Sequence, residues 1–232
     1  MEAGFYPKLA LDGIRKNKRM YLPYILTCVG MVMMYYIIVF LQYTNTLDYL
    51  PGAETIRITL QFGGWVIAFF ATIFLFYTNA FLIRRRKKEF GLYNILGMGK
   101  WNIGRILFCE TIIIAITSLG IGLIAGIALS KLAELGLVNV LKADVTYTLK
   151  VSLEAIGMTS IVFGVIFALL FLNAIRQIKM ANAISLLRSE NVGEKPPKAN
   201  WIFGILGVIV LGVAYYIAVT IEAPIAAIVW FF

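Results

Sequence analysis

The residues in this sequence whose types and spacing could do chemistry lie between Asn94 and Trp101, where glycines precede Lys100 as they do in a phosphate-binding loop. Such a loop needs Gly-x-x-x-x-Gly-Lys-Ser/Thr after a strand, because its backbone N–H groups cradle the phosphates and its hydroxyl binds magnesium. Here Asn94 stands at the first glycine position and Trp101 at the hydroxyl position. The sequence therefore predicts no nucleotide site in this chain, and any ATP is expected to be hydrolysed by another subunit.

No other pattern in the sequence predicts catalysis or metal binding. The 232 residues include no histidine, which excludes Ser-His and Cys-His catalytic pairs and histidine-containing zinc sites. The two cysteines, Cys28 and Cys109, lie inside apolar runs and make neither a disulfide framework nor a metal set. We expect no catalytic residue, no metal site and no cofactor in this chain, which is predicted not to be an enzyme.

The elements that surround these residues are long apolar runs. Hydrophobic residues make up 61% of the chain and charged residues 14%, whereas a soluble domain carries about 25% charged residues. The apolar residues fall in runs of about 20, the length at which a helix crosses a bilayer core. The sequence predicts an all-α, polytopic membrane protein with five full spans, at 21–41, 60–83, 106–129, 153–175 and 201–221, and the start of a sixth from residue 225.

The positive charges predict the orientation of the chain in the membrane. The net charge of +9 could also indicate nucleic-acid binding, but the cations flank the apolar runs and do not interleave with exposed aromatic residues. Of the 21 lysines and arginines, all but four lie before residue 20, between 84 and 105 or between 176 and 198; the four are Arg57, Lys131, Lys142 and Lys150. Because cytoplasmic loops are the ones rich in Lys and Arg, we predict a cytoplasmic N-terminus and no nucleic-acid partner.

The chain is expected to contain four segments. Residues 1–20 are predicted to form a cytoplasmic helix that lies on the membrane surface with its cations toward lipid phosphates; a loosely ordered basic flank is the alternative. Residues 21–188 are predicted to form a four-span bundle. The prolines in the charged run at 189–200 predict a cytoplasmic linker. Residues 201–232 are predicted to form a fifth span and the start of a sixth. Since 225–232 is too short to cross a bilayer, we expect a piece of a longer protein.

The stretch between the second and third predicted spans is expected to dock on another protein. It opens with five cations predicted to anchor the chain at the membrane: Arg84, Arg85, Arg86, Lys87 and Lys88. A short helix follows within 89–99, and Gly97 and Gly99 let the chain reverse closely against a partner. The predicted docking residues are Glu89, Phe90, Leu92, Tyr93, Ile95, Leu96 and Met98. The alternative is that they merely lie in the lipid interface. A short helix at 183–187 is a second candidate contact.

Other features inside the predicted spans concern packing. Small residues recur every four positions on one face of the third span, a spacing that lets membrane helices approach closely: Ser118, Gly122, Gly126 and Ser130. Glu110 lies one turn inside the same span, where an unpaired carboxylate is costly. We expect it to pair with Arg105 or with a member of the cluster 84–88. Asn79, near the inner end of the second span, is expected to hydrogen-bond to a neighbouring helix.

A family resemblance rests on the tract Lys88-Glu-Phe-Gly-Leu-Tyr-Asn-Ile-Leu-Gly-Met-Gly-Lys100. It resembles the first cytoplasmic loop of FtsX-like ABC permeases, whose members carry Arg/Lys-Glu-Ile/Phe-Gly-Leu followed by Leu-Gly-Met/Ala. Other tracts resemble the BceB-type permeases of antimicrobial-peptide-resistance transporters: Asn17-Lys-Arg-x-Tyr21, Phe40-x-Gln42-Tyr43, Tyr77-x-Asn79-x-Phe81-x-Ile83-Arg84-Arg85, Ser130-Lys131 and Lys142-Ala143-Asp144. The resemblance covers nearly the whole chain, and residues 77–105 are its most specific part.

The resemblance implies a permease of ten spans in the bacterial cell membrane, with a large extracellular domain of which most would lie beyond Phe232. It implies two copies of a cytoplasmic ABC ATPase that bind ATP and magnesium and dock at 89–99. The implied function is removal of peptide antibiotics such as bacitracin from lipid precursors of the cell wall, which confers resistance. Signalling to a sensor histidine kinase is also implied.

Two other classes of membrane protein remain as rivals. The alternative is an FtsX-like mechanotransmitter that regulates extracellular partners without transport, although the tracts at Asn79 and at 142–144 favour the permease. A secondary transporter is less favoured, because such proteins usually carry ionisable residues or broken helices at the membrane midplane. No predicted span carries a charge at its midplane.

Overall fold

The computed structural model describes residues 4–44, 52–141, 151–180 and 201–220 of the chain. Every regular element in these ranges is an α-helix, which confirms the all-α prediction for this part of the chain. The chain divides into two units, Met1–Glu190 and Asn191–Phe232. The helices are α1 (Phe5–Lys16), α2 (Lys18–Tyr43), α3 (Ala53–Arg85), α4 (Lys87–Ile95), α5 (Lys100–Leu141) and α6 (Leu153–Met180) in the first unit, and α8 (Trp201–Thr220) in the second.

Four helices of the first unit are long and apolar enough to cross a membrane, and they contain the first four predicted spans: Lys18–Tyr43, Ala53–Arg85, Lys100–Leu137 and Leu153–Ile178. The fifth predicted span coincides with α8, in which the described apolar segment, Gly204–Val213, is shorter than a span. The predicted linker at 189–200, the 183–187 helix and the start of a sixth span lie outside the described residues.

The longest helix, α5, differs from its predicted bounds. It has 42 residues, which gives a length of about 63 Å, whereas the hydrocarbon core of a bilayer is about 30 Å thick. It begins at Lys100, so that residues 101–105, predicted to belong to a loop, form its first turns. The cations and the tryptophan at this end are therefore placed on a regular helix.

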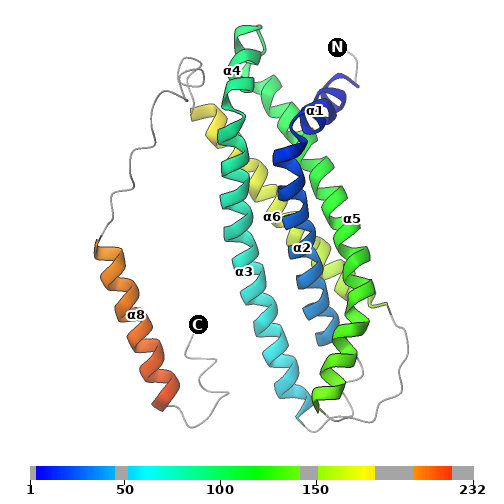
Figure 1. The fold of residues 1–232 in the computed structure, drawn as a ribbon, viewed down its shortest axis with the longest axis vertical. Coiled ribbons are helices and arrows are strands. Elements are labelled where there is room, and N and C mark those ends of the chain that lie inside the picture. The colour runs from blue at the N-terminus through cyan, green and yellow to red at the C-terminus, as the bar shows by residue number, and fades with distance from the viewer. Residues whose placement is uncertain (1–3, 45–51, 142–150, 181–200, 221–232) are drawn as a thin grey trace. The chain divides into compact units, whose positions relative to one another are not determined.

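At the centre of the bundle, α2 contacts α3, α5 and α6 (Figure 1). Its buried side chains, among them Val32 and Tyr36, belong to one core cluster with Leu75 of α3 and Phe163 of α6. A polar contact also joins two helices of this bundle, because the Asn79 side-chain amide donates to the Leu170 carbonyl of α6 at 3.3 Å. This bond confirms the interhelical role predicted for Asn79.

The small-residue face of α5 lies against α2. Gly122 and Gly126 are buried there, as are the outer members of the series, Ser118 and Ser130. A Cβ atom added at Gly122 would lie 2.7 Å from Val32, and one at Gly126 would lie 2.8 Å from the Tyr36 ring. Since real Cβ atoms are not found at such separations, the two helices could not approach this closely with larger residues at these positions.

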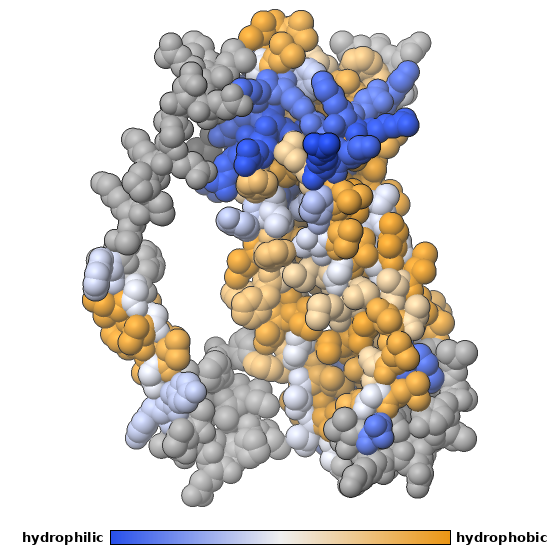
Figure 2. Space-filling view, in the orientation of Figure 1, coloured by the Kyte–Doolittle hydropathy of each residue, from blue (hydrophilic) through white to orange (hydrophobic). Residues whose placement is uncertain are grey.

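The two short helices, α1 and α4, lie at the same end of the bundle (Figure 1). α1 packs on α5 with Ala10 fully buried, while Phe5 and Leu11 are exposed. Hydrophilic side chains gather in a band at this end of the first unit, and a hydrophobic tip extends beyond them (Figure 2). This end therefore combines the highest charge density with an exposed apolar surface.

Candidate functional site

α4 is a short helix held between the ends of two long ones. Arg86 alone separates it from α3, and it stops before Gly97, whose φ of +87° lies in the left-handed region. The Gly97 N–H donates to the Asn94 carbonyl at 3.1 Å, and the Met98 N–H donates to the Tyr93 carbonyl at 2.9 Å. This pair of bonds is the Schellman arrangement, in which a glycine ends a helix and redirects the chain. It turns the chain from α4 into α5.

The apolar residues of α4 face in two directions. Phe90 is fully buried and packs in a small core cluster with Ile83, Ile103, Leu107, Ala174 and Ile178. Leu92, Ile95 and Leu96 are each more than half exposed, and we call these three residues the α4 tip. Among the seven predicted docking residues, Phe90 therefore holds α4 to the bundle, whereas the α4 tip is open to a partner. The remaining three are partly buried: Glu89, Tyr93 and Met98.

Beneath α4, a network of charged and polar side chains is centred on Arg86. Its Nη1 atom lies 2.6 Å from Glu110 Oε2 on α5 and also donates to the Tyr21 hydroxyl of α2. Its Nε atom lies 2.9 Å from Glu89 Oε2 on α4. The Tyr21 hydroxyl donates to Glu110 Oε2 at 2.9 Å, and Asn17 Nδ2 donates to Glu89 Oε1 at 2.7 Å. We call these five residues the Arg86 network.

Burial makes the Arg86 network energetically important. Arg86 is 1% exposed and Glu110 is 3% exposed, and buried charges are tolerated only when they are paired and hydrogen-bonded. The Arg86 guanidinium also lies over the ring of Phe90, with 4.9 Å between its central carbon and the ring centroid. Burial lowers the pKa of Arg86, but the Glu110 carboxylate, together with Tyr21 and Glu89, more than offsets that effect and the net pKa is raised. Arg86 is therefore a permanent cation fixed between two carboxylates.

α1 closes over the network at Gly13. A Cβ atom added there would lie 3.1 Å from Arg86 Nη2 and 3.1 Å from Glu110 Oε1. Only a glycine lets the α1 backbone approach this ion pair without pushing it aside. No hydrogen-bond donor among the described residues reaches Glu110 Oε1, so this carboxylate depends on Arg86 and Tyr21 for compensation.

A cavity of about 260 Å³ opens between α1 and α4, beside the network. Asn17 and Glu89 belong both to its lining and to the Arg86 network, so the network reaches the surface here. The other lining residues are Leu9, Asp12, Gly13, Lys16, Leu92 and Tyr93. The cavity thus lies between α1 and the α4 tip. Within the Arg86 network, the bond between Asn17, at the end of α1, and Glu89 of α4 connects the two helices.

The structure divides the predicted cation cluster. Arg84, Arg85 and Lys88 are exposed and Lys87 is partly buried, in keeping with positions at a membrane surface. Arg86 departs from the predicted anchoring role, because its side chain turns into the bundle and binds two carboxylates. The pairing of Glu110 with this cluster was one of the two predicted alternatives. The other candidate, Arg105, instead lies over the Tyr6 ring, 5.6 Å from its centroid.

Sequence reasoning assigned no role in this site to three of its members, Gly13, Asn17 and Tyr21, although Asn17 and Tyr21 belong to a tract that resembles the BceB-type permeases. Asn17 and Tyr21 are four residues apart, which places them on one face where α2 begins. That spacing, together with the lone carboxylate at position 110, was the available signal. Gly13 gave no signal, because its role arises from a contact between α1 and residues far away in the sequence.

Comparison with known proteins identifies relatives of the chain. The family model described as "FtsX-like permease C-terminal" matches residues 62–180, a range that includes α4, Arg86 and Glu110. The chain is 29% identical over 215 residues to the bacitracin export permease protein BceB of Bacillus subtilis, a match that covers 91% of this chain and 33% of that protein.

Two further relatives show similar coverage. The bacitracin export permease protein BceB of Halalkalibacterium halodurans is 30% identical over 214 residues, covering 90% of this chain and 33% of the relative. The uncharacterized ABC transporter permease YvcS of Bacillus subtilis is 26% identical over 218 residues, covering 93% of this chain and 34% of the relative. The chain therefore spans about a third of the length of the curated relatives that it matches.

Proposed function

Because this chain belongs to the FtsX-like permease family, we propose that it forms part of the membrane subunit of an ABC transporter driven by a partner ATPase. It is a multi-pass protein of the bacterial cell membrane. Its likeness to two bacitracin export permeases supports a transporter that removes bacitracin-like peptides from lipid precursors of the cell wall and so confers resistance. The proposal includes five spans, a cytoplasmic N-terminus and signalling to a sensor histidine kinase.

The α4 tip is the observation that carries this proposal. Three large apolar side chains are exposed on α4 and at its C-cap, at the end of the bundle where hydrophilic side chains form a band (Figure 2). The cations mark the cytoplasmic side, where the ATPase of an ABC transporter lies. Exposed apolar surface that is rimmed by polar residues is typical of protein–protein or membrane interaction sites, and its removal from water favours association. We propose that Leu92, Ile95 and Leu96 dock on the ATPase, with Glu89, Tyr93 and Met98 at the edge of the contact.

The Arg86 network supplies the mechanical connection that such a docking helix needs. Glu89 of α4 is bonded to Asn17, where α2 begins, and to Arg86, where α3 ends. Arg86 is in turn bonded to Glu110 of α5. The Arg86–Glu110 pair is almost fully buried, and a charge left there without its partner would be strongly unfavourable, so the connection resists separation. In the proposed mechanism, a displacement of α4 by the ATPase moves the ends of three spans together.

ATP and magnesium bind, in this proposal, only in the partner subunit. The tract that ends at Lys100 lacks the first glycine and the hydroxyl residue of a phosphate-binding loop. The contribution of this chain is therefore to receive the movement that hydrolysis produces, and its residues take no part in the hydrolysis step.

Replacing Leu96 by aspartate tests the docking proposal in the full-length permease expressed with its ATPase. Leu96 is 71% exposed, so a carboxylate there leaves the bundle intact but places a charge in the proposed apolar contact. We expect co-purification of the ATPase to fall at least tenfold and peptide resistance to be lost. Leu11→Asp is the matched control, because Leu11 is also exposed at this end but lies on α1. Normal co-purification with Leu96→Asp, in a variant that elutes like the parent protein, refutes docking at the α4 tip.

A further inference from the structure

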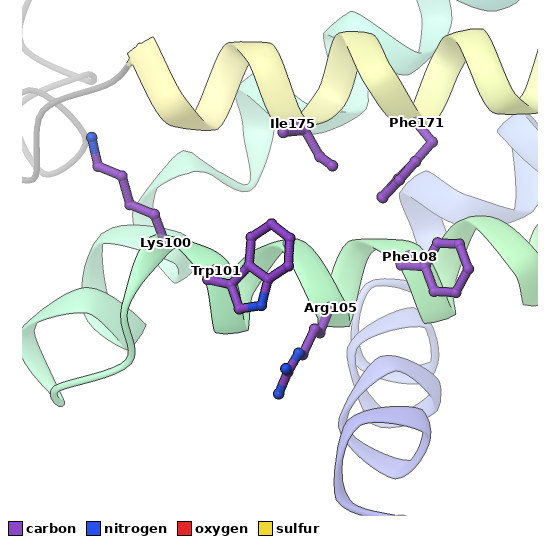
Figure 3. A pocket seen from close by; sticks show the side chains of 7 residues that line it. Lys100, Trp101, Arg105, Phe108, Phe171 and Ile175 are labelled. Atoms are coloured by element: carbon purple, nitrogen blue, oxygen red, sulfur yellow. The ribbon is translucent and has the colours of Figure 1, made fainter.

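A second cavity lies between α5 and α6, outside the Arg86 network, and has a volume of about 220 Å³. Figure 3 shows its lining side chains, which come from the first turns of α5 (100–108) and from the last part of α6 (171–175). Its described lining consists of seven residues: Lys100, Trp101, Gly104, Arg105, Phe108, Phe171 and Ile175. Neither the proposed docking contact nor the Arg86 network uses any of them.

The walls of this cavity are apolar. The rings of Phe108 and Phe171 lie 5.2 Å apart between centroids and close one end, and Ile175 extends from α6 toward α5 (Figure 3). At Gly104 an added Cβ atom would meet nothing within 4 Å, so the α5 backbone itself borders open space. Cavities that enclose a whole drug-sized ligand measure about 300–1,000 Å³. A cavity of this size therefore suits an apolar segment of a molecule whose remainder lies outside.

The charged residues in the described lining of the cavity are both cations. Lys100 and Arg105 extend from α5 on either side of the Trp101 indole (Figure 3), and all three side chains are exposed. Among the residues that the structure describes, none of those lining the cavity is acidic. Tryptophan with Lys and Arg at the end of an apolar helix is typical of the level at which lipid headgroups lie. An anion at this level would meet the Lys100 and Arg105 side chains beside the apolar slot, and the Arg105 guanidinium also lies over the Tyr6 ring of α1.

We propose that this cavity binds an anionic membrane phospholipid. Its phosphate lies at the level of Lys100 and Arg105, the Trp101 indole lies against the glycerol region, and the upper part of one acyl chain lies along Gly104 and ends at the contact between Phe108 and Phe171. The lipid is preferred to a soluble anion because the apolar walls would contribute nothing to binding an inorganic phosphate. The inference does not depend on the proposed transport of peptides.

Fluorescence quenching by brominated lipids tests this site. Trp101 is kept as the sole tryptophan in the full-length protein, which is reconstituted in phosphatidylcholine containing increasing amounts of brominated phosphatidylglycerol, and then in the reverse mixture. Because each Lys or Arg near an anionic surface strengthens binding about fivefold, we expect phosphatidylglycerol to be preferred over phosphatidylcholine by about fivefold or more at Trp101. A protein whose sole tryptophan is Trp65, exposed on α3, reports on ordinary surrounding lipid. The ratio of its affinities for phosphatidylglycerol and phosphatidylcholine should be near one.

Two kinds of variant separate the parts of the proposed site. The double variant Lys100→Gln with Arg105→Gln should bring the ratio of affinities for the two lipids at Trp101 close to one. Arg85→Gln removes an exposed cation of α3 and should leave this ratio unchanged. Gly104→Leu fills the cavity and should abolish the preference while both cations remain. Gly120→Leu is its control, because an added Cβ there also meets nothing within 4 Å.

The proposal is overturned by an equal affinity for the two lipids at Trp101, or by a preference that is the same at Trp65. It is also overturned if the preference for phosphatidylglycerol at Trp101 persists in the variant without the two cations and in Gly104→Leu. Circular dichroism and elution volume show whether each variant is folded. If one variant has lost its fold, the result of the other variant decides the test.

Discussion

Replacing Arg86 by methionine removes the one cation of the Arg86 network while keeping a side chain of similar length. The two carboxylates would remain. Glu89 is 29% exposed and keeps its bond to Asn17, so water and the amide can still compensate it. Glu110 is 3% exposed and would retain only the Tyr21 hydroxyl, because no described donor reaches its second oxygen. The perturbation therefore falls almost entirely on one buried carboxylate.

The magnitude follows from that burial. Removing one partner of a buried ion pair costs about 3–5 kcal/mol, mainly because the remaining charge is left uncompensated. A buried pair replaced as a whole by well-packed hydrophobic residues of similar volume is often neutral in stability. We therefore expect Arg86→Met to lower the free energy of unfolding by about 3–5 kcal/mol. The double variant Arg86→Met with Glu110→Gln should recover part of this loss, since the glutamine carries no charge and can still accept the Tyr21 hydrogen bond, although its buried NH2 group gains no described acceptor.

The assay is unfolding of the purified protein by sodium dodecyl sulfate in mixed micelles, followed by circular dichroism. Arg85→Met is the matched control, because Arg85 is the preceding residue but is exposed, and surface changes of this kind stay within about 0.5 kcal/mol. A loss below about 1 kcal/mol in Arg86→Met, or a double variant no more stable than the single one, would show that the pair is not a buried, mutually dependent unit.

Two further predictions concern close approaches of glycines. Gly122→Ala should lower the free energy of unfolding by about 1–3 kcal/mol, because its Cβ would lie 2.7 Å from the stiff Val32 side chain. The same unfolding assay measures this loss. An unchanged free energy of unfolding would mean that α2 and α5 can separate without cost. Gly13→Ala should destabilise by about 1 kcal/mol, although alanine favours a helix, because Arg86 is fixed by two carboxylates and cannot move away. Stabilisation by Gly13→Ala would show that α1 is not pressed on the network. Gly120→Ala, with open space at its Cβ, is the control for both.

The positions and types of the elements were predictable because they depend on local composition. Apolar runs of membrane length mark the four long helices of the first unit, and they appear where hydropathy alone predicts them. A short helix followed by a reversal was predicted before Gly97, and a glycine with positive φ stands there. The bounds were less certain, because hydropathy marks the part of a helix that lies in lipid. α5 therefore begins six residues before its predicted apolar run, at Lys100.

The partners of the charged residues could not be predicted in the same way. Five consecutive cations look alike in sequence, yet on a helix each successive side chain turns by about 100°, and only one of the five faces the interior. Which one does so depends on how α3 and α4 meet. Similarly, Glu110 was expected to find a cation, and both Arg105 and the 84–88 cluster were within reach. The structure pairs it with Arg86, because Arg105 faces α1 and lies over Tyr6.

The sequence by itself determined that this chain is a helical membrane protein with a basic end and a short apolar helix, because length, hydropathy and charge bias are read locally along the chain. Only the tertiary structure decided that Arg86 is an interior residue, that Gly13 seals the network and that Phe90 holds α4 while Leu92, Ile95 and Leu96 stay exposed. The physical reason is that burial and ion pairing depend on residues distant in sequence, whose distances are fixed only when the helices pack.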